Sequence, residues 1–468
     1  MSRTEIEVDY LVIGGGAMGM AFADVLLAET DATLAIVDRR HRPGGHWNDS
    51  YPFVRLHQPS AFYGVNSREL GSGAIDAVGL NAGLYELASG SEVCAYFDHV
   101  MHQTFLPSGR VHYFPLSNYE GHGTFSSLGN GASTSVRAGK VVDATYMNVS
   151  VPSTRPPVYE VGEGVRCVPL NELPKLMQPQ PYVVVGGGKT AMDACLFLLK
   201  NGTDPDQITW IMPRDSWLLD RAQIQPGAEF AGTAVGGIAK TLDAIIEASD
   251  VEELFDLLEQ NGRLMRLDES IRPTMYRCAT VTKAEVDELR KIDNVVRLGR
   301  VESISSDEIR LDRGSIPTAP NTLHVDCSAD GLATRPASPI FTGDTMTLQT
   351  VRTCQQVFSA AFIAHVEAAY DGDEIKNELC GVVPHPNTDI DYMRTQRQAS
   401  MNSARWAQDA DLTEWLRDAR LDGFSRRQPV DGAEIPAEMA AHFQNVMENT
   451  LPAIEKLGQF LASVESSV

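Results

Sequence analysis

Two glycine-rich segments of the same plan constrain the fold of this chain of 468 residues more than any other feature. They are "VDYLVIGGGAMGMAFADVLLAE" (residues 8–29) and "QPYVVVGGGKTAMDACLFLLKN" (residues 180–201). Each passes from a short run rich in aliphatic residues through three glycines into a helical pattern. A strand, a tight glycine turn and a helix in this order form the phosphate-binding end of a Rossmann-like unit. The sequence therefore predicts an α/β fold with two dinucleotide-binding units.

The first segment has the spacing G-x-G-x-x-G. Gly14 allows the tight turn, Gly16 lets the backbone approach a pyrophosphate, and Gly19 lets helix and strand pack closely. Asp38 ends the next predicted strand, about 20 residues further on, where a carboxylate accepts a hydrogen bond from a ribose hydroxyl. Arg39 beside it is a further candidate for cofactor binding. These residues fit FAD and NAD equally well.

The second segment has the related spacing G-x-G-x-x-A, with Gly186 and Gly188 as its glycines. Lys189 and Thr190 follow in the first helical turn, where both side chains can donate to a pyrophosphate. The next predicted strand ends near Arg214. Because a guanidinium suits a ribose 2′-phosphate, we expect this unit to bind NADPH.

The loop "RPGGHW" (residues 42–47) favours FAD over NAD in the first unit. Its glycine pair and aromatic residue can wrap a loop over a flat ring system. A second nicotinamide would leave the hydride of NADPH without an acceptor, whereas a flavin accepts it. The predicted cofactors are therefore FAD and NADPH.

In its motifs the chain resembles the flavin-containing monooxygenases and their Baeyer–Villiger relatives, within the flavoproteins that have two dinucleotide-binding domains. The resemblance extends over roughly the first two-thirds of the chain. The family's F-x-G-x-x-x-H-x-x-x-W motif is not present before the second unit, as in a divergent branch. The matching motifs are "IGGGAMG", "GGHW", "YPFVRLH" (residues 51–57), "VNSREL" (residues 65–70), "VVVGGGKTAMD" and "MPRDSWLLDR" (residues 212–221).

The resemblance assigns roles to several residues near the chain start. It implies that Gly45, Trp47 and Arg55 lie along the flavin. Asn66 matches the family's active-site asparagine, beside the isoalloxazine and its oxygen adduct. His57 would also lie along the flavin and could act as a proton relay, since the ordinary pKa of histidine is close to neutral.

A later segment, "SPIFTGDTMTLQTVRTCQQVFSAAFIAHVEAA" (residues 338–369), resembles the closing FAD element of the wider class. In that element an Asp after a Gly meets the ribitol, and the next helix points its N-terminus at the flavin. The resemblance therefore nominates Gly343 and Asp344 as cofactor-binding residues.

The implied activity is that of an FAD-dependent, NADPH-consuming monooxygenase. Such an enzyme inserts one oxygen atom from O2 into a small organic substrate, at nitrogen, sulfur or a ketone, through a flavin hydroperoxide. Three alternatives stay open: an NADPH-dependent flavoprotein reductase or oxidase of the same fold, a non-enzymatic redox sensor that holds both dinucleotides, and a plain NAD-binding module.

Charge and cysteine spacing limit partners and location. With 62 acidic against 39 basic residues the formal net charge is −23, which repels nucleic acid and anionic membranes. The seven cysteines lie far apart without a C-x-x-C pair, so we expect no metal site, dithiol chemistry or disulfide, and a cytoplasmic location. The apolar run of residues 10–28 is interrupted by four glycines and Asp24, unlike a secretory signal or membrane span.

The order of these patterns predicts a discontinuous first domain. We expect residues 1–150 and 320–400 to form the FAD-binding domain, and residues 151–319 to form the NADPH-binding domain. A mostly helical insertion is expected at about residues 227–293. Residues 401–468 should be a helical C-terminal extension that caps the cleft or makes a homodimer contact.

Overall fold

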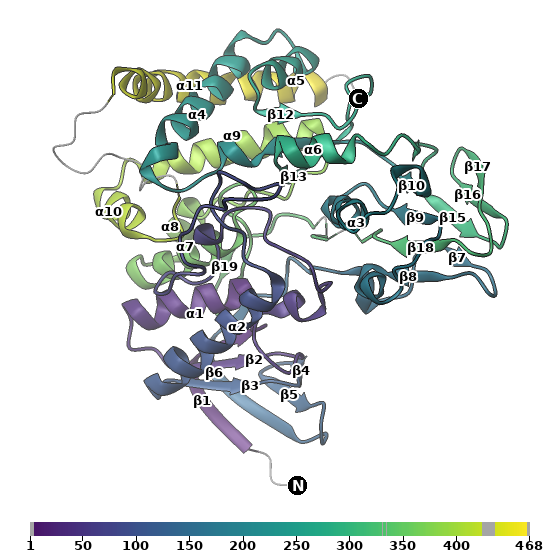
Figure 1. Cartoon of the computed structure of the whole chain (residues 1–468). Coiled ribbons are helices and arrows are strands. Elements are labelled where there is room, and N and C mark those ends of the chain that lie inside the picture. The colour runs from purple at the N-terminus through teal and green to yellow at the C-terminus, as the bar shows by residue number, and fades with distance from the viewer. Residues whose placement is uncertain (1–3, 330, 334, 424–435, 466–468) are drawn as a thin grey trace.

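The structure is a computed structural model that describes residues 4–329, 331–333, 335–423 and 436–465. The predicted C-terminal range 401–468 thus includes residues 424–435 and 466–468, which lie outside the described residues. Figure 1 shows three parts: a sheet with helices at the bottom, a second sheet on the right, and a group of helices at the top.

The first unit is built on a sheet of eight strands, in the order β19-β20-β6-β1-β2-β3, with β5 attached to β6 and β4 attached to β5. β1 pairs in parallel with β2 and β6. Its apolar residues, such as Leu11 and Val12, are buried, as is typical of strands in a parallel sheet. The helices α1 and α7 pack beside each other on this sheet (Figure 1). The bounds are β1 (Thr4–Ile13), β2 (Leu34–Val37), β3 (Val111–Phe114), β4 (Ser117–Gly121), β5 (Thr124–Ser127), β6 (Ser133–Asp143), β19 (Phe341–Thr342), β20 (Thr345–Thr347), α1 (Ala17–Glu29), α2 (Gly90–Val100), α7 (Gln356–Ala369) and α8 (Asp373–Leu379).

The second unit is a five-stranded sheet in the order β14-β10-β9-β18-β8, with all neighbours parallel. Its strand β9 leads through the second glycine segment into α3, as β1 leads into α1. The predicted pair of Rossmann-like units is therefore confirmed. The bounds are β8 (Cys167–Pro169), β9 (Tyr182–Val185), β10 (Ile208–Ile211), β14 (Val295–Val296), β18 (Leu323–Asp326) and α3 (Lys189–Lys200).

The predicted boundary between residues 319 and 320 is wrong. β18 follows it in the sequence, yet this strand pairs with β8 and β9 inside the second sheet. The chain returns to the first sheet only with β19 and β20, of which β20 pairs with β6. β18 lies between β9 and β8 and joins them into one sheet, and sequence position alone did not show that this strand belongs there.

The predicted helical insertion also contains strands. It holds three helices, but β12 and β13 pair with β11 in a separate three-stranded sheet. A further sheet has four strands, in the order β17-β16-β15-β7. The bounds are β11 (Ser216–Asp220), β12 (Leu264–Met265), β13 (Met275–Val281), α4 (Ala231–Glu247), α5 (Val251–Gln260), α6 (Lys283–Leu289), β7 (Glu160–Val161), β15 (Val301–Ile304), β16 (Glu308–Leu311) and β17 (Gly314–Pro317).

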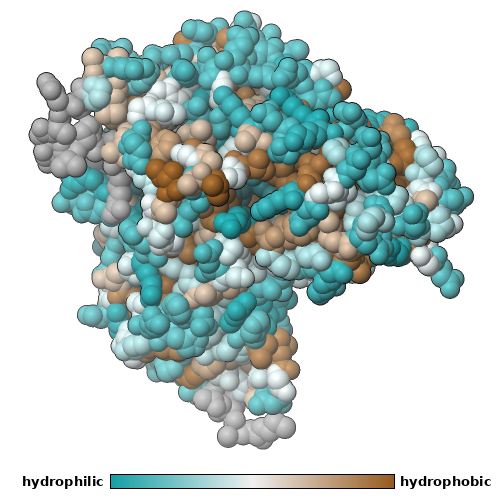
Figure 2. Space-filling model, in the orientation of Figure 1, coloured by the Kyte–Doolittle hydropathy of each residue, from teal (hydrophilic) through white to brown (hydrophobic). Residues whose placement is uncertain are grey.

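The C-terminal helices α9 (Asp389–Trp406), α10 (Ala410–Asp418) and α11 (Ala437–Glu465) are partly joined to this insertion. Trp217, Phe255, Tyr392 and Phe460 share one core, so α9 and α11 pack on α4 and α5 at the top of Figure 1. The predicted boundary at residue 401 falls inside α9. In the same orientation, apolar surface gathers in the band between this helical part and the first sheet (Figure 2).

Candidate functional site

Three neighbouring cavities extend from the first unit, past the second glycine segment, to the C-terminal helices. The first cavity, beside Asp38, has a volume of about 390 Å³. The central cavity, beside Trp47, has about 290 Å³, and the helical cavity, beside Tyr392, has about 470 Å³. His46 and Gln356 line both the first and the central cavity. The three cavities therefore form one row that joins both glycine segments.

The first glycine segment forms one wall of the first cavity, as predicted. Gly14 has a φ of +102°, which favours glycine, and a Cβ on Gly19 would lie 2.0 Å from the carbonyl oxygen of Gly14. Gly45 has a φ of +57°, and its Cβ would lie 2.9 Å from the Cα of Gly16. The loop "RPGGHW" therefore rests directly on the glycine turn.

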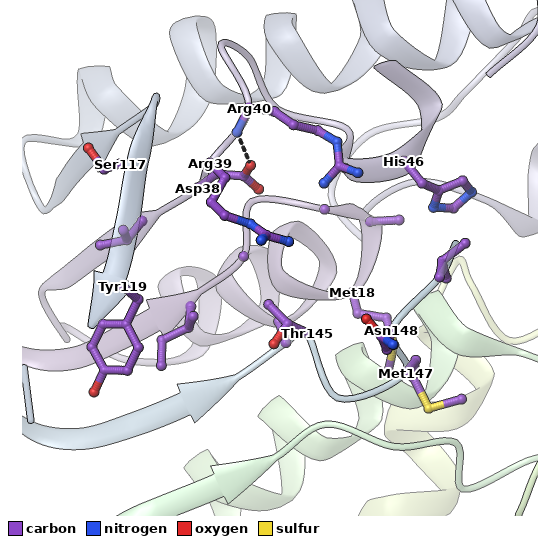
Figure 3. Close-up of a pocket in the computed structure, with 18 of the residues that line it drawn as sticks. Met18, Asp38, Arg39, Arg40, His46, Ser117, Tyr119, Thr145, Met147 and Asn148 are labelled. Carbon is purple, nitrogen blue, oxygen red and sulfur yellow. Dashed lines mark hydrogen bonds between the residues drawn. The ribbon is translucent and has the colours of Figure 1, made fainter. Parts of the chain in front are cut away.

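Asp38 is buried at the carboxyl end of β2 and faces the first cavity (Figure 3). Its two carboxylate oxygens accept hydrogen bonds from the backbone N–H groups of Gly15, at 2.6 Å, and Arg40, at 2.7 Å. Burial raises the pKa of Asp38, against these hydrogen bonds. Arg39 and Arg40 line the same cavity, so cationic groups stand beside the carboxylate.

The predicted flavin wall lines the central cavity. Trp47, Arg55 and His57 are all among its lining residues. The indole of Trp47 donates to the hydroxyl of Tyr63 at 2.7 Å, and the Arg55 guanidinium donates to the carbonyl of Leu87 at 2.8 Å. The wall is therefore held by bonds to neighbouring loops.

His57 faces the central and helical cavities, but the argument for its pKa was wrong. The ring is exposed only toward these cavities, and desolvation by their walls, with the charges of Lys189 and Arg221, lowers the pKa of His57 to about 4. Arg221 also fixes its backbone, because the guanidinium donates to the His57 carbonyl at 3.0 Å. At neutral pH the imidazole is therefore neutral, and a relay role would have to start from that form.

Three histidines that line the cavities, His46, His57 and His385, give the chain a stability that depends on pH. His46 and His385 also have pKa values lowered to about 4, mainly by burial, from an ordinary 6.5. The unfolded chain binds these protons near 6.5 and the folded chain only near 4, so the free energy of unfolding should fall as pH drops through this window. Urea unfolding at successive pH values measures it. His57→Gln should flatten the slope, whereas His41→Gln, at a site that lines none of the three cavities, should not.

Asn66 does not line any of the three cavities, contrary to its predicted catalytic role. Its Oδ1 accepts a hydrogen bond from the backbone N–H of Leu421 at 3.3 Å. Arg420 donates to the carbonyls of Ala61, at 2.8 Å, and Tyr63, at 2.9 Å. The C-terminal part of the chain thus covers the "VNSREL" segment.

Asn66→Ala is therefore expected to lower the stability of the fold and to leave catalysis unchanged. Loss of one hydrogen bond should lower the free energy of unfolding by about 1 kcal/mol. Thermal unfolding measures this change, while the ratio of H2O2 formed to NADPH consumed should stay as in the wild type. A large rise in that ratio would restore the catalytic role.

The second glycine segment faces the central and helical cavities. Gly186 has a φ of +141°, and a Cβ there would lie 2.7 Å from the carbonyl oxygen of Cys327. Gly188 is the N-cap of α3 and lines the helical cavity, while Lys189 and Thr190 line both. Lys189 forms an ion pair with Asp193. The first turn of α3 is therefore presented to the row of cavities.

Arg214 lies elsewhere. Its guanidinium donates to Asn387 Oδ1 at 2.9 Å and contacts Met275, and it lines none of the three cavities. The loop before α9 thus binds the side chain that was predicted to meet a 2′-phosphate. Phosphate binding by Arg214 stays a prediction and would need this contact to open.

The prediction for Gly343 and Asp344 is wrong in its placement. Both residues are exposed in the turn between β19 and β20, where the Gly343 N–H donates to Asp373 at 2.6 Å. Because β20 runs parallel to β6, this turn lies at the amino end of the sheet, opposite the carboxyl ends where dinucleotides bind. Gln356, the first residue of α7, lines all three cavities instead.

Comparisons with known proteins agree with this geometry. A family model described as "NAD(P)-binding Rossmann-like domain" matches residues 12–65. The "Uncharacterized protein Rv2000" of Mycobacterium tuberculosis is 55% identical over 417 residues, 89% of this chain and 78% of that protein. The chain belongs to the family of this mycobacterial protein.

More distant likenesses cover parts of the chain or its fold. A "Ferredoxin--NADP reductase" of Saccharopolyspora erythraea is 31% identical over 195 residues, 41% of this chain and 50% of that protein. The solved "Flavin-containing monooxygenase from Stenotrophomonas maltophilia" is similar with a TM-score of 0.46 and 14% identity, over 78% of this chain and 97% of that one. This last likeness concerns the fold alone.

The expectation that no disulfide forms is also wrong. Cys278 in β13 and Cys354 before α7 are joined by a disulfide, with their Cα atoms 6.7 Å apart. They are 76 residues apart in the sequence, so no spacing motif could have shown the pair. Because the structure contains this disulfide, the cysteines no longer indicate a reducing compartment.

No group of three or more His, Cys, Asp or Glu residues in the described part of the chain could hold a metal ion. No helix among those residues is long and apolar enough to cross a membrane.

Proposed function

We propose that the chain is an FAD- and NADPH-dependent oxidoreductase that acts on a small organic molecule. The observation that carries this proposal is the row of three cavities, because it links two glycine-lined dinucleotide cradles through one central cavity. A nucleotide in each cradle would have its reactive ring near the other's.

FAD fits the first and central cavities. Gly16 and the uncapped N-terminus of α1 offer backbone N–H groups to a pyrophosphate, and Asp38 offers an acceptor to a ribose. Trp47 supplies an aromatic wall in the central cavity. Bound FAD would accept a hydride and pass its electrons onward.

NADPH fits the second cradle. The uncapped first turn of α3 presents Gly188, Lys189 and Thr190 toward the helical and central cavities. Gln355 lines the helical cavity, and its buried Oε1 has no hydrogen-bond partner among the described residues. A donor on a bound molecule would satisfy this atom.

We further infer oxygenation of a small substrate in the helical cavity. Its volume of about 470 Å³ suits a small organic molecule. Leu242, Ile245, Tyr392 and Leu457 give it an apolar wall from α4, α9 and α11. Oxygen transfer requires that water be kept out of the site, and an apolar wall helps to exclude it. The neutral His57 can hold or release a hydrogen bond at the junction with the central cavity.

The fate of O2 tests this function. Purified protein supplied with FAD is expected to be yellow and to consume NADPH in air. With an amine, a thioether or a ketone from a substrate panel, oxygenated product should account for the NADPH consumed, as measured by mass spectrometry. If H2O2 accounts for all of it across the panel while a dye is reduced rapidly, the chain is a reductase or oxidase. A protein that stays colourless contradicts the whole proposal.

A further inference from the structure

The Cys278–Cys354 disulfide lies in the wall of the proposed site. Both cysteines line the helical cavity, and Cys354 also lines the central cavity. Both side chains are partly exposed there. The pair joins the inserted sheet to the segment that leads into α7. It is therefore within the row of cavities through which electrons are proposed to pass.

The backbone at this disulfide is in an unfavourable conformation on both sides. Cys278 has a φ of +55°, and Thr353, directly before the other cysteine, has a φ of +35°. Residues other than glycine rarely adopt such a φ, because the side chain then crowds the backbone. Strained backbone of this kind clusters at functional sites.

A histidine stands beside the pair. His385 Nδ1 is 3.9 Å from Cys354 Sγ. Burial and the charge of Arg277 lower the pKa of His385 to about 4, so its ring is neutral at neutral pH. At this distance a neutral imidazole can accept a hydrogen bond from the thiol of a reduced Cys354 and so hold that sulfur in place for disulfide exchange.

The helical cavity favours an anionic molecule. Arg263 and Arg277 line it, as does Lys189, whose charge is paired with Asp193, and no described Asp or Glu residue lines it. This lining contrasts with the net charge of −23 for the whole chain. An anionic small molecule would therefore be drawn to the cavity that exposes both cysteines.

We propose that Cys278 and Cys354 are a redox-active pair that passes electrons from reduced flavin to a small anionic disulfide. This proposal rests on the proposed NADPH-dependent flavin chemistry. The S–S bond takes up two electrons and two protons and becomes two thiols, while reduced flavin loses the same and becomes oxidised flavin. One cysteine thiolate then attacks the small disulfide and releases one thiol. The second cysteine attacks the mixed disulfide, releases the other thiol and restores the pair.

The first test counts electrons and thiols without oxygen. FAD-loaded protein is titrated with NADPH, trapped with iodoacetamide and analysed by peptide mass spectrometry. We expect two NADPH per flavin and alkylation of Cys278 and Cys354 only after NADPH. The five free cysteines, Cys94, Cys167, Cys195, Cys327 and Cys380, are the internal reference.

The outcomes separate this proposal from the proposed function. If the flavin is bleached by one NADPH and the pair stays unlabelled, the cysteine proposal fails and the flavin function stands. If NADPH leaves the flavin oxidised, the proposed function fails, and dithionite replaces NADPH. Labelling after dithionite would then still support transfer from flavin to the pair, and its absence would overturn it.

The second test uses variants and 5,5′-dithiobis(2-nitrobenzoate) as the anionic disulfide. Cys354→Ser and Cys278→Ala should each keep NADPH bleaching of the flavin, need only one NADPH, and lose NADPH-dependent release of the coloured thiol. Cys167→Ser is the matched control, since Cys167 is partly exposed but lines none of the three cavities. Unchanged release in both pair variants would overturn the proposal.

Discussion

Gly45→Ala is expected to purify without bound flavin. A Cβ at this position would lie 2.9 Å from the Cα of Gly16, a backbone atom that cannot turn away. The loop "RPGGHW" must then move off the first glycine turn, which reshapes the first cavity. We expect FAD affinity to fall by at least about tenfold, which corresponds to ~1.4 kcal/mol. Titration of the flavin-free protein with FAD, followed by fluorescence, measures the loss.

Gly73→Ala is the matched control for this variant. Gly73 has a φ of +71°, close to the +57° of Gly45, but no atom lies within 4 Å of its added Cβ. Both variants therefore bear the penalty of about 1–2 kcal/mol for a left-handed alanine, and only Gly45→Ala adds the clash. Equal FAD affinity in the two variants would show that the approach of Gly45 to Gly16 does not shape the cofactor site.

Gly186→Ala should weaken the use of NADPH while FAD stays bound. Its Cβ would lie 2.7 Å from the Cys327 carbonyl oxygen, so the turn between β9 and α3 must shift. The first cavity lies in the other unit, so the protein should stay yellow. NADPH should then bleach the flavin at least about tenfold more slowly at a fixed concentration, whereas dithionite should bleach it as in the wild type.

Gly314→Ala controls for the cost of the backbone conformation alone. Gly314 has a φ of +142°, close to the +141° of Gly186, and the nearest atom to its added Cβ is Leu298 Cδ1 at 3.6 Å, an ordinary contact. Its reduction by NADPH should match the wild type. If Gly186→Ala instead loses flavin, or is reduced by NADPH at the wild-type rate, the assignment of NADPH to the second cradle fails.

The parts of the site that sequence could predict are those set by local backbone geometry. Gly14, Gly19 and Gly186 each serve a turn or a close approach within one strand–turn–helix unit. The spacing of glycines reports such constraints directly, because few other residues can meet them. Asp38 belongs to the same group, since it ends the strand beside that turn.

The parts that sequence could not predict depend on distant segments. Asn66 is held by the backbone of Leu421, which lies 355 residues away in the sequence. Arg214 is held by Asn387 from the loop before α9. Each motif matched a family pattern, but the C-terminal helices and their loops changed the surroundings of the side chain. A motif gives the residue type and the local backbone, and packing decides where the side chain goes.

The closing segment shows a third kind of limit. The "TGD" motif was predicted to lie at the cofactor, yet Gly343 and Asp344 form the tip of a short hairpin at the amino ends of the strands, opposite the dinucleotide-binding end. The residues that reach the cavities come later, at the N-terminus of α7. A strand of three residues, β20, decides the direction of the chain here, and so short an element has little sequence signal.

Anaerobic mixing of the FAD-loaded wild-type protein with NADPH tests the central claim most directly, because the claim is that two cradles share one row of cavities. Flavin absorbance is the measurement. The account predicts complete loss of the oxidised-flavin spectrum, with NADPH converted to NADP. A spectrum that stays oxidised with NADPH, in protein that dithionite bleaches at once, would contradict it.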